Sequence, residues 1–217
     1  MKSLFKLFLI IAAIFGSTFV IIKSMGLLSI EQIEGWLSDA KLLSPFYVGG
    51  LVALLLFADL FIAIPTLTVS IFSGFLLGHI YGAIAALIGV VLAGICGYLL
   101  SYYYGDKILG VLIKDEKDRK DAIKSFNTHG FVMILLSRAM PILPESSACL
   151  SGMTKMPFSK FLLAWLLSSV PYILIATYVG SISTLDNPKP AIFGAIGITT
   201  FFWVSWYVYH RLNKNKL

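Results

Sequence analysis

Three charged side chains stand inside long apolar runs, and they are the residues best placed to do chemistry. Asp59 has apolar neighbours on both sides and no opposite charge within five residues, while Arg138 and Glu145 interrupt the apolar stretch from Phe131 to Leu150. A charge in hydrocarbon is costly, so each must face protein or water, pair with an opposite charge or lose its charge. Charged residues in membrane segments therefore indicate a substrate or ion site.

Each of these residues also has a simpler structural explanation. Asp59 could cap a half-helix, and Arg138 could extend its guanidinium toward the membrane surface. Glu145 directly follows Pro144, and a proline at the first helical position with an acid in the first turn is a common helix start. The sequence favours a functional role over a structural one for Asp59 and Arg138. For Glu145 the functional and the structural explanation are about equally supported.

The combination of these groups predicts an anion-binding site. If the broken segments meet, Arg138 would neutralise Asp59 or Glu145 at rest and present its planar donors to a phosphate. Half-helices that begin after Pro65 and Pro144 would add backbone N–H donors for the same anion. We therefore expect an anionic amphiphile as substrate. A carboxylate there could also take up a proton, which leaves proton coupling open.

The other reactive residue types form no recognisable constellation. The three histidines, His79, His129 and His210, are scattered at the edges of apolar segments, and the cysteines, Cys96 and Cys149, belong to no CxxC motif. A zinc site, a disulfide framework and hydrolase chemistry based on histidine are therefore disfavoured. We expect no metal, no cofactor and no enzymatic activity.

Composition sets the class of protein. Of the 217 residues, 58% are apolar and only 13% are charged, and the mean hydropathy is +0.88. These values predict an all-α polytopic membrane protein. The net charge of +6 then indicates membrane topology and anionic head groups, and no nucleic-acid partner is expected.

Uninterrupted apolar runs predict the spanning helices, which need about 20 residues each. The first run follows Lys2 and Lys6 and lacks a small-residue cleavage site, so we expect an uncleaved transmembrane helix within residues 1–30. Further spans are expected at residues 82–104, 158–178 and 191–209, the last within a C-terminal segment, 190–217, that ends in a basic tail.

Two apolar stretches, near 48–78 and 131–152, are broken in the middle. Asp59 and Pro65 break the first, and Arg138, Pro141 and Pro144 break the second. Lipid cannot satisfy the backbone groups that such breaks expose, so they must be covered by protein or line a wet cavity. We predict two re-entrant hairpins. The charged segment between them, 106–129, is expected to be a solvated amphipathic surface helix.

The distribution of positive charge supports one orientation. We place the N-terminus in the cytoplasm, and let the first hairpin enter from outside and the second from inside. Thirteen of the 17 Lys and Arg residues are then cytoplasmic and one is in the membrane; only residues 23, 41 and 189 are outside. This agrees with the positive-inside rule. It also predicts an inverted repeat with its substrate site at the midplane.

Glycines are expected to pack the helices together. Gly74, Gly78 and Gly82 recur at intervals of four, as do Gly89, Ala93 and Gly97. Such stripes let membrane helices approach closely and are weak evidence for a ligand site. The predicted packing residues are Gly74, Gly78, Gly82, Gly97 and Gly152.

The order of these residues resembles a known family, the DedA / SNARE-associated Golgi superfamily with its VTT domain, over about residues 45–182. The resemblance is carried by Pro65, Ser73-Gly74, Gly78, Tyr81-Gly82, Gly97-Tyr98, Gly105, Phe131-x6-Arg138-x2-Pro141-x2-Pro144, Gly152, Phe158, Phe161, Pro171 and Gly180. It implies two re-entrant loops in inverted orientation.

The resemblance also implies a role in lipid movement: phospholipid scrambling in eukaryotic members, and flipping of polyprenyl phosphate or phospholipid carriers in bacterial ones. Arg138, Pro141 and Pro144 match the second-loop motif, and Asp59 stands where the family often has an acid before the first-loop proline. The chain departs from the pattern at Ser101-Tyr102, where many members carry a Gly-Arg pair.

We therefore expect a flippase or scramblase for anionic lipids in a bacterial cytoplasmic membrane, with both termini cytoplasmic. Lipid head groups are the expected partners, and protons and a second copy of the chain are left open. One alternative is a membrane scaffold that recruits partners through residues 106–129. The other, a lipid phosphatase or transferase, is disfavoured because neither broken segment contains the histidine that would activate a nucleophile.

Overall fold

The computed structural model describes residues 44–62, 64–112, 116–139, 143–184 and 187–213, and all regular structure in these ranges is helical. The predicted N-terminal helix and Pro141 lie outside them. The helices are α3 (Pro45–Ala58), α4 (Thr66–Leu77), α5 (His79–Leu112), α6 (Glu116–Leu136), the short 3-10 helix η2 (Ser137–Ala139), α7 (Leu143–Met153), α8 (Phe158–Ser181) and α9 (Lys189–Asn213).

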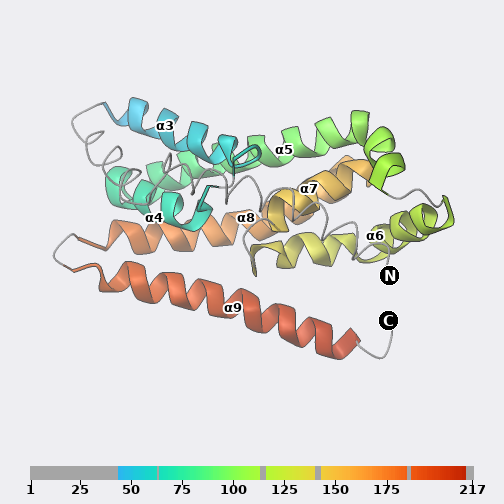
Figure 1. Cartoon of the computed structure of the whole chain (residues 1–217). Coiled ribbons are helices and arrows are strands. Elements are labelled where there is room, and N and C mark those ends of the chain that lie inside the picture. The colour runs from blue at the N-terminus through green and yellow to red at the C-terminus, as the bar shows by residue number, and fades with distance from the viewer. Residues whose placement is uncertain (1–43, 63, 113–115, 140–142, 185–186, 214–217) are drawn as a thin grey trace, which may run out of the picture. The chain divides into compact units, whose positions relative to one another are not determined.

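The helices belong to two compact units (Figure 1). The α3–α4 unit contains the described residues up to Ala93 together with Ser169–Thr200. The α6–α7 unit contains Gly94–Ser168 and the described residues from Phe201 onward. Each unit therefore holds one broken hairpin and one part of each of α5, α8 and α9.

In the α3–α4 unit, the chain breaks where the sequence predicts it. Helix α3 begins at Pro45, buries Val48, Val52 and Leu56 at helical spacing, and ends before Asp59. Helix α4 begins directly after Pro65, because the proline ring disfavours helical backbone at the residue before it. The two helices pack against each other. Gly78 ends α4 with a φ of 77° and α5 follows at once.

In the α6–α7 unit, one helix boundary differs from the prediction. The expected surface helix to His129 and the expected first limb of the hairpin from Phe131 form one continuous helix, α6. Gly130 does not interrupt it. The ring of Phe126, which is fully buried, packs where a side chain of residue 130 would lie. The break comes at η2, and Pro144 is the second residue of α7, which begins at Leu143.

The long helices match the predicted spans in position. Among the described residues, three helical stretches are long and apolar enough to cross a membrane: His79–Gly105, Phe158–Ser181 and Lys189–Val208. Helix α5 runs further than expected, to Leu112, and Pro171 lies inside α8 without ending it. Membrane helices tolerate such prolines when neighbouring groups satisfy the freed carbonyl. The chain is thus a polytopic helical membrane protein.

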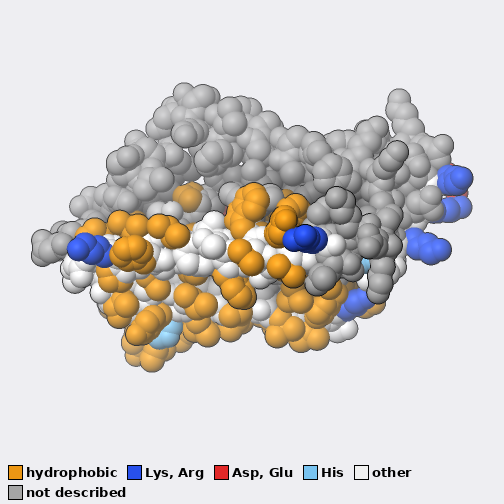
Figure 2. Space-filling view, turned by 90° about the horizontal axis from the view of Figure 1, so that it is seen from below, with side chains coloured by type: hydrophobic (Ala, Val, Ile, Leu, Met, Phe, Trp, Pro, Cys, Tyr) orange, Lys and Arg blue, Asp and Glu red, His pale blue; other side chains and the backbone are white. Residues whose placement is uncertain are grey.

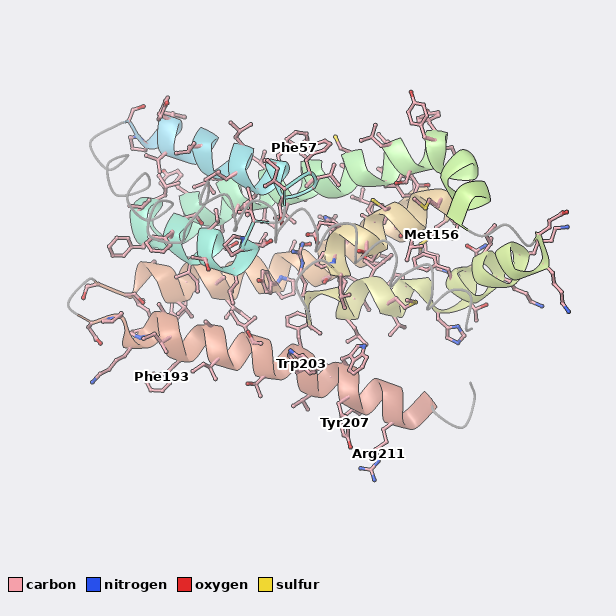
Figure 3. The ribbon with its side chains drawn as sticks, viewed as in Figure 1. Phe57, Met156, Phe193, Trp203, Tyr207 and Arg211 are labelled. Carbon is pink, nitrogen blue, oxygen red and sulfur yellow. The ribbon has the colours of Figure 1, made fainter. Side chains whose placement is uncertain are left out.

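Hydrophobic side chains cover much of the surface. Figure 2 shows them spread over most of the described surface in that view, with Lys and Arg at a few places. Helix α9 is the clearest example, since only 6% of its spanning window is buried. Phe193, Trp203 and Tyr207 project from it, with Arg211 near its end (Figure 3). A helix this apolar and exposed fits lipid rather than water as its surroundings.

Candidate functional site

Asp59 lies in the first break and closes it. Its side chain is only 6% exposed, and its two carboxylate oxygens accept hydrogen bonds from the Ile64 backbone N–H at 2.8 Å and the Thr66 hydroxyl at 2.6 Å. These bonds join the end of α3 to the start of α4. Bonds to a charged acceptor are among the strong ones. The geometry therefore supplies the structural role that the sequence offered as an alternative.

Helix α4 carries buried hydroxyls that the sequence analysis did not single out. Ser70 and Ser73 are both fully buried. Ser70 donates to the Thr66 carbonyl at 2.7 Å, and Ser73 donates to the Ser70 carbonyl at 2.8 Å. The only sequence signal was the recurrence of serine on one side of α4, because hydroxyls satisfied by their own helix are compatible with an apolar core.

Gly74 follows these serines and makes a close contact with a neighbouring helix. A Cβ on Gly74 would overlap the backbone of Thr177 in α8. On the other helix, a Cβ on Gly180 would overlap the backbone of Ile71. Two glycines thus face each other's helices, which is the close approach expected of small residues in membranes.

Arg138 lies in η2, in the second break, beside an aromatic ring. Its Cζ is 5.2 Å from the centroid of the Trp165 ring in α8, the side chain is half-buried, and its Nε is buried. This distance is within the range of a cation–π interaction, for which tryptophan is the best partner. The ring therefore contributes a favourable surface for the charge.

Helix α7 begins on the far side of the same break. Glu145 is in its first turn, where a carboxylate complements the helix dipole. Pro144 is buried, as are Ser147 and Ser151, which donate to the carbonyls of Pro144 at 2.8 Å and Ser147 at 2.6 Å. The second break therefore leads into a helix with the same kind of inward, self-bonded serines as α4.

Gly152 completes the likeness to α4. A Cβ on Gly152 would overlap the Tyr98 carbonyl in α5 and lie 2.7 Å from the Tyr102 backbone nitrogen. A Cβ on Gly105, also in α5, would lie 2.8 Å from the Met153 Cα. As with Gly74 and Gly180, the close approach involves a glycine on each helix.

The remaining predicted packing glycines behave differently from one another. Gly82 lies against α4, since a Cβ there would be 2.6 Å from the Ser73 carbonyl oxygen. Gly97 is buried within α5. Gly78 corrects the expectation of a packing contact, because it is exposed and a Cβ there would meet nothing within 4 Å. Its positive φ of 77° explains the glycine instead, because other residues rarely adopt that conformation.

The charged part of α6 fits the solvated helix that the sequence predicts. Glu116 and Lys120 form an ion pair of 2.7 Å on one face, with both side chains about three-quarters exposed, at 73% and 75%. Lys117 and Lys124 are exposed as well. Pairs of this kind are ordinary features of a water-facing helix.

The candidate site residues are divided between the two units. Asp59 is in the α3–α4 unit, and Arg138 and Glu145 are in the α6–α7 unit. The pairing of Arg138 with Asp59 stays a prediction. The described residues hold no group of three His, Cys, Asp or Glu side chains that could bind a metal ion. Trp165, the ring beside Arg138, was missed by sequence analysis because the two residues are 27 positions apart in the chain.

Comparisons with known proteins match most of the region that contains these breaks. The family model of the VTT domain matches residues 64–182, which include Arg138 and Glu145 and begin just after Asp59. An uncharacterized membrane protein of Synechocystis sp. is 26% identical over 180 aligned positions, and the match covers 70% of this chain and 78% of that protein. No solved structure matches.

Proposed function

The chain belongs to the VTT-domain family of membrane proteins, and from this premise we propose that it moves anionic lipids between the leaflets of a membrane. The family is often linked to membrane lipid transport. The proposed substrates are phospholipids or polyprenyl phosphates, and the protein leaves them chemically unchanged.

Arg138 carries the proposal. It is a half-buried cation in the break between α6 and α7, and its Cζ is 5.2 Å from the centroid of the Trp165 ring. The ring attracts the positive charge, and the N–H donors of a guanidinium form a planar fork. Such donors match two oxygens of a phosphate, so Arg138 is suited to hold a head group while the acyl or prenyl tails stay in lipid.

The residues around Arg138 suit the same task. The N-terminal turn of α7 follows the break, and the positive end of a helix dipole favours an anion. Glu145 in that turn would repel the phosphate when ionised and admit it when protonated, which would couple transport to protons. Asp59 is proposed to support the path indirectly, because its hydrogen bonds to Ile64 and Thr66 close the first break.

The proposed location is a bacterial cytoplasmic membrane with both termini in the cytoplasm. The exposed charges Lys117, Lys120 and Lys124 of α6 and Lys155 and Lys160 beyond α7 would then all face the cytoplasm, in agreement with the positive-inside rule. The two broken hairpins would be re-entrant and of opposite orientation.

Leaflet exchange in liposomes tests the proposal. Purified protein is reconstituted with a fluorescent phospholipid or a fluorescent polyprenyl phosphate, and exchange is followed by quenching of the outer leaflet, with and without a proton gradient. We expect wild-type protein to exchange at least one of these lipids and Arg138→Gln to be at least about tenfold slower, because a charge-assisted phosphate contact contributes about 1.5–3 kcal/mol.

Arg211→Gln is the matched control, since it removes one exposed arginine from α9 outside both breaks. It should exchange lipid at the wild-type rate. A wild-type protein that exchanges none of these lipids under any gradient would overturn the proposal. Equal loss of exchange in both arginine variants would show that Arg138 acts only through overall charge.

A further inference from the structure

A buried row of aromatic rings leads to Arg138 within the α6–α7 unit. The rings of Tyr98 and Phe161 are stacked at 4.8 Å with an interplanar angle of 19°, and the rings of Phe161 and Trp165 follow at 5.6 Å and 35°. Arg138 lies over the last ring of the row. All three aromatic residues are at most 3% exposed. The cation is therefore placed against a surface that belongs to the core of the unit.

The Trp165 ring has little freedom to move. On α5, Gly94 lies so close to it that a Cβ there would be 2.5 Å from the indole Nε1 and 2.7 Å from Cζ2. Phe161, one turn earlier on α8, is fully buried. Tyr98, at the other end of the row, donates a hydrogen bond of 2.5 Å to the carbonyl of Met156 (labelled in Figure 3). Well-packed rings of this kind are fixed in one rotamer.

The same face of α8 also holds the backbone next to Arg138. Ser168, three residues after Trp165, donates a hydrogen bond to the Leu135 carbonyl at 3.2 Å. Leu135 is in the last turn of α6, where carbonyls lack partners within the helix. Helix α8 thus contacts the chain at two points around the break, one on the backbone before Arg138 and one on its side chain.

We propose that Trp165 is a positioning residue for Arg138, which it holds with the edge donors of the guanidinium turned toward the phosphate of a lipid head group. This inference rests on the proposed function and deepens it, because it assigns the selection of phosphate-bearing head groups to a ring and a cation together. Without the ring, the guanidinium would sample many rotamers and lose entropy each time it bound a phosphate.

A lipid-free measurement tests the placement itself. The chain has four tryptophans, and replacing Trp36, Trp203 and Trp206 by Phe leaves Trp165 as the only one. We expect Arg138→Gln in this background to shift the emission maximum and raise quenching by acrylamide by about twofold, since the cation no longer covers the ring. Superimposable spectra and quenching, with unchanged thermal unfolding, would overturn the proposal.

Leaflet exchange then tests the consequence. Tryptophan is the best cation–π partner and phenylalanine is weaker, whereas leucine has no ring. We expect Trp165→Phe to be about threefold slower than wild type and Trp165→Leu about tenfold slower, the latter equal to about 1.4 kcal/mol. Trp203→Leu, at a 47% exposed position of α9, is the matched control and should leave the rate unchanged.

A double variant separates positioning from mere packing. Trp165→Leu should not slow Arg138→Gln any further, because the ring acts through the cation. A further loss of about tenfold on top of Arg138→Gln would mean that the ring only supports the fold, and it would overturn the proposal. If wild-type protein exchanges no lipid, the proposed function fails, and the fluorescence comparison still decides whether the ring holds the cation.

Discussion

The two units solve the same packing problem in the same way. In each, the second helix of the hairpin carries a Ser-Gly pair, Ser73-Gly74 in α4 and Ser151-Gly152 in α7. Each of these glycines lies on the backbone of a long helix, α8 for Gly74 and α5 for Gly152. In each unit, a glycine of the long helix also lies against the backbone of the hairpin helix. Such a shared contact is what a repeat would produce. The inverted repeat inferred from the charge distribution itself stays a prediction.

The units differ in the contacts that the charged side chain makes at the break. Asp59 is bound by the loop that it closes, through Ile64 and Thr66. The Cζ of Arg138 lies over the Trp165 ring at 5.2 Å from its centroid. A carboxylate used in this way stabilises the hairpin, whereas a guanidinium beside a ring is a group of the kind that binds phosphate. One scaffold thus places a structural charge in one unit and a candidate binding charge in the other.

The strongest test of the likeness is to fill the close contacts. Gly74→Ala and Gly152→Ala each place a Cβ into the backbone of the neighbouring helix, so helices must separate. We expect each to lower the free energy of unfolding by about 3 kcal/mol or more. Thermal unfolding in detergent, followed by circular dichroism, measures the effect.

Gly50→Ala is the control for the glycine variants, because a Cβ at Gly50 meets nothing within 4 Å. It should be neutral or stabilising by up to about 1 kcal/mol, as expected for alanine in a helix. Should only one of the two buried glycine variants be destabilised, the units would not share a packing design.

The difference between the charges is tested by Asp59→Asn. The amide keeps the shape but loses the charge and one acceptor oxygen, so we expect the free energy of unfolding to fall by about 2 kcal/mol. Lipid exchange per folded molecule should fall by less than about threefold, in contrast to Arg138→Gln, which should change stability little. Unfolding in detergent and exchange in liposomes measure the two quantities. The reverse result, normal stability with exchange abolished, would make Asp59 a second ligand-binding charge.

Thr66→Val gives the smallest expected effect and sharpens the role of Asp59. It removes one donor to the carboxylate and keeps the side-chain volume, so we expect a loss of about 1 kcal/mol in unfolding free energy. Thr128→Val, whose exposed hydroxyl bonds the Lys124 carbonyl, is the control and should change stability by less than about 0.5 kcal/mol. A Thr66 variant no less stable than this control would show that the bond contributes nothing net.

The elements that the sequence predicts well are those set by local chemistry. The breaks at Asp59 and Pro65 and before Pro144 follow from prolines and from charge in apolar runs. The spanning helices follow from length and hydropathy. Helix α6 was divided wrongly because the change from charged to apolar residues near residue 130 was read as a boundary, although one helix can carry both kinds of residue.

The features that the sequence could not predict depend on contacts between distant residues. Nothing near Arg138 in the chain indicates Trp165, and nothing near Gly74 indicates Thr177. The contact between Asp59 and Thr66 could have been predicted. Thr66 follows Pro65 directly, and hydroxyls of Ser and Thr commonly form local hydrogen bonds. Gly78 was mistaken for a packing residue because spacing alone does not distinguish a packing glycine from a turn glycine.

The single residue between α4 and α5 has a mechanical consequence. Gly78 is the whole connection between the two helices, and four residues later Gly82 touches the backbone of Ser73 too closely to admit a side chain. Rotation about φ and ψ of Gly78 is the only backbone freedom between the two helices, and the contact of Gly82 with Ser73 opposes it. While this contact holds, α4 and the first turns of α5 should therefore tilt together, and separating them requires that it open.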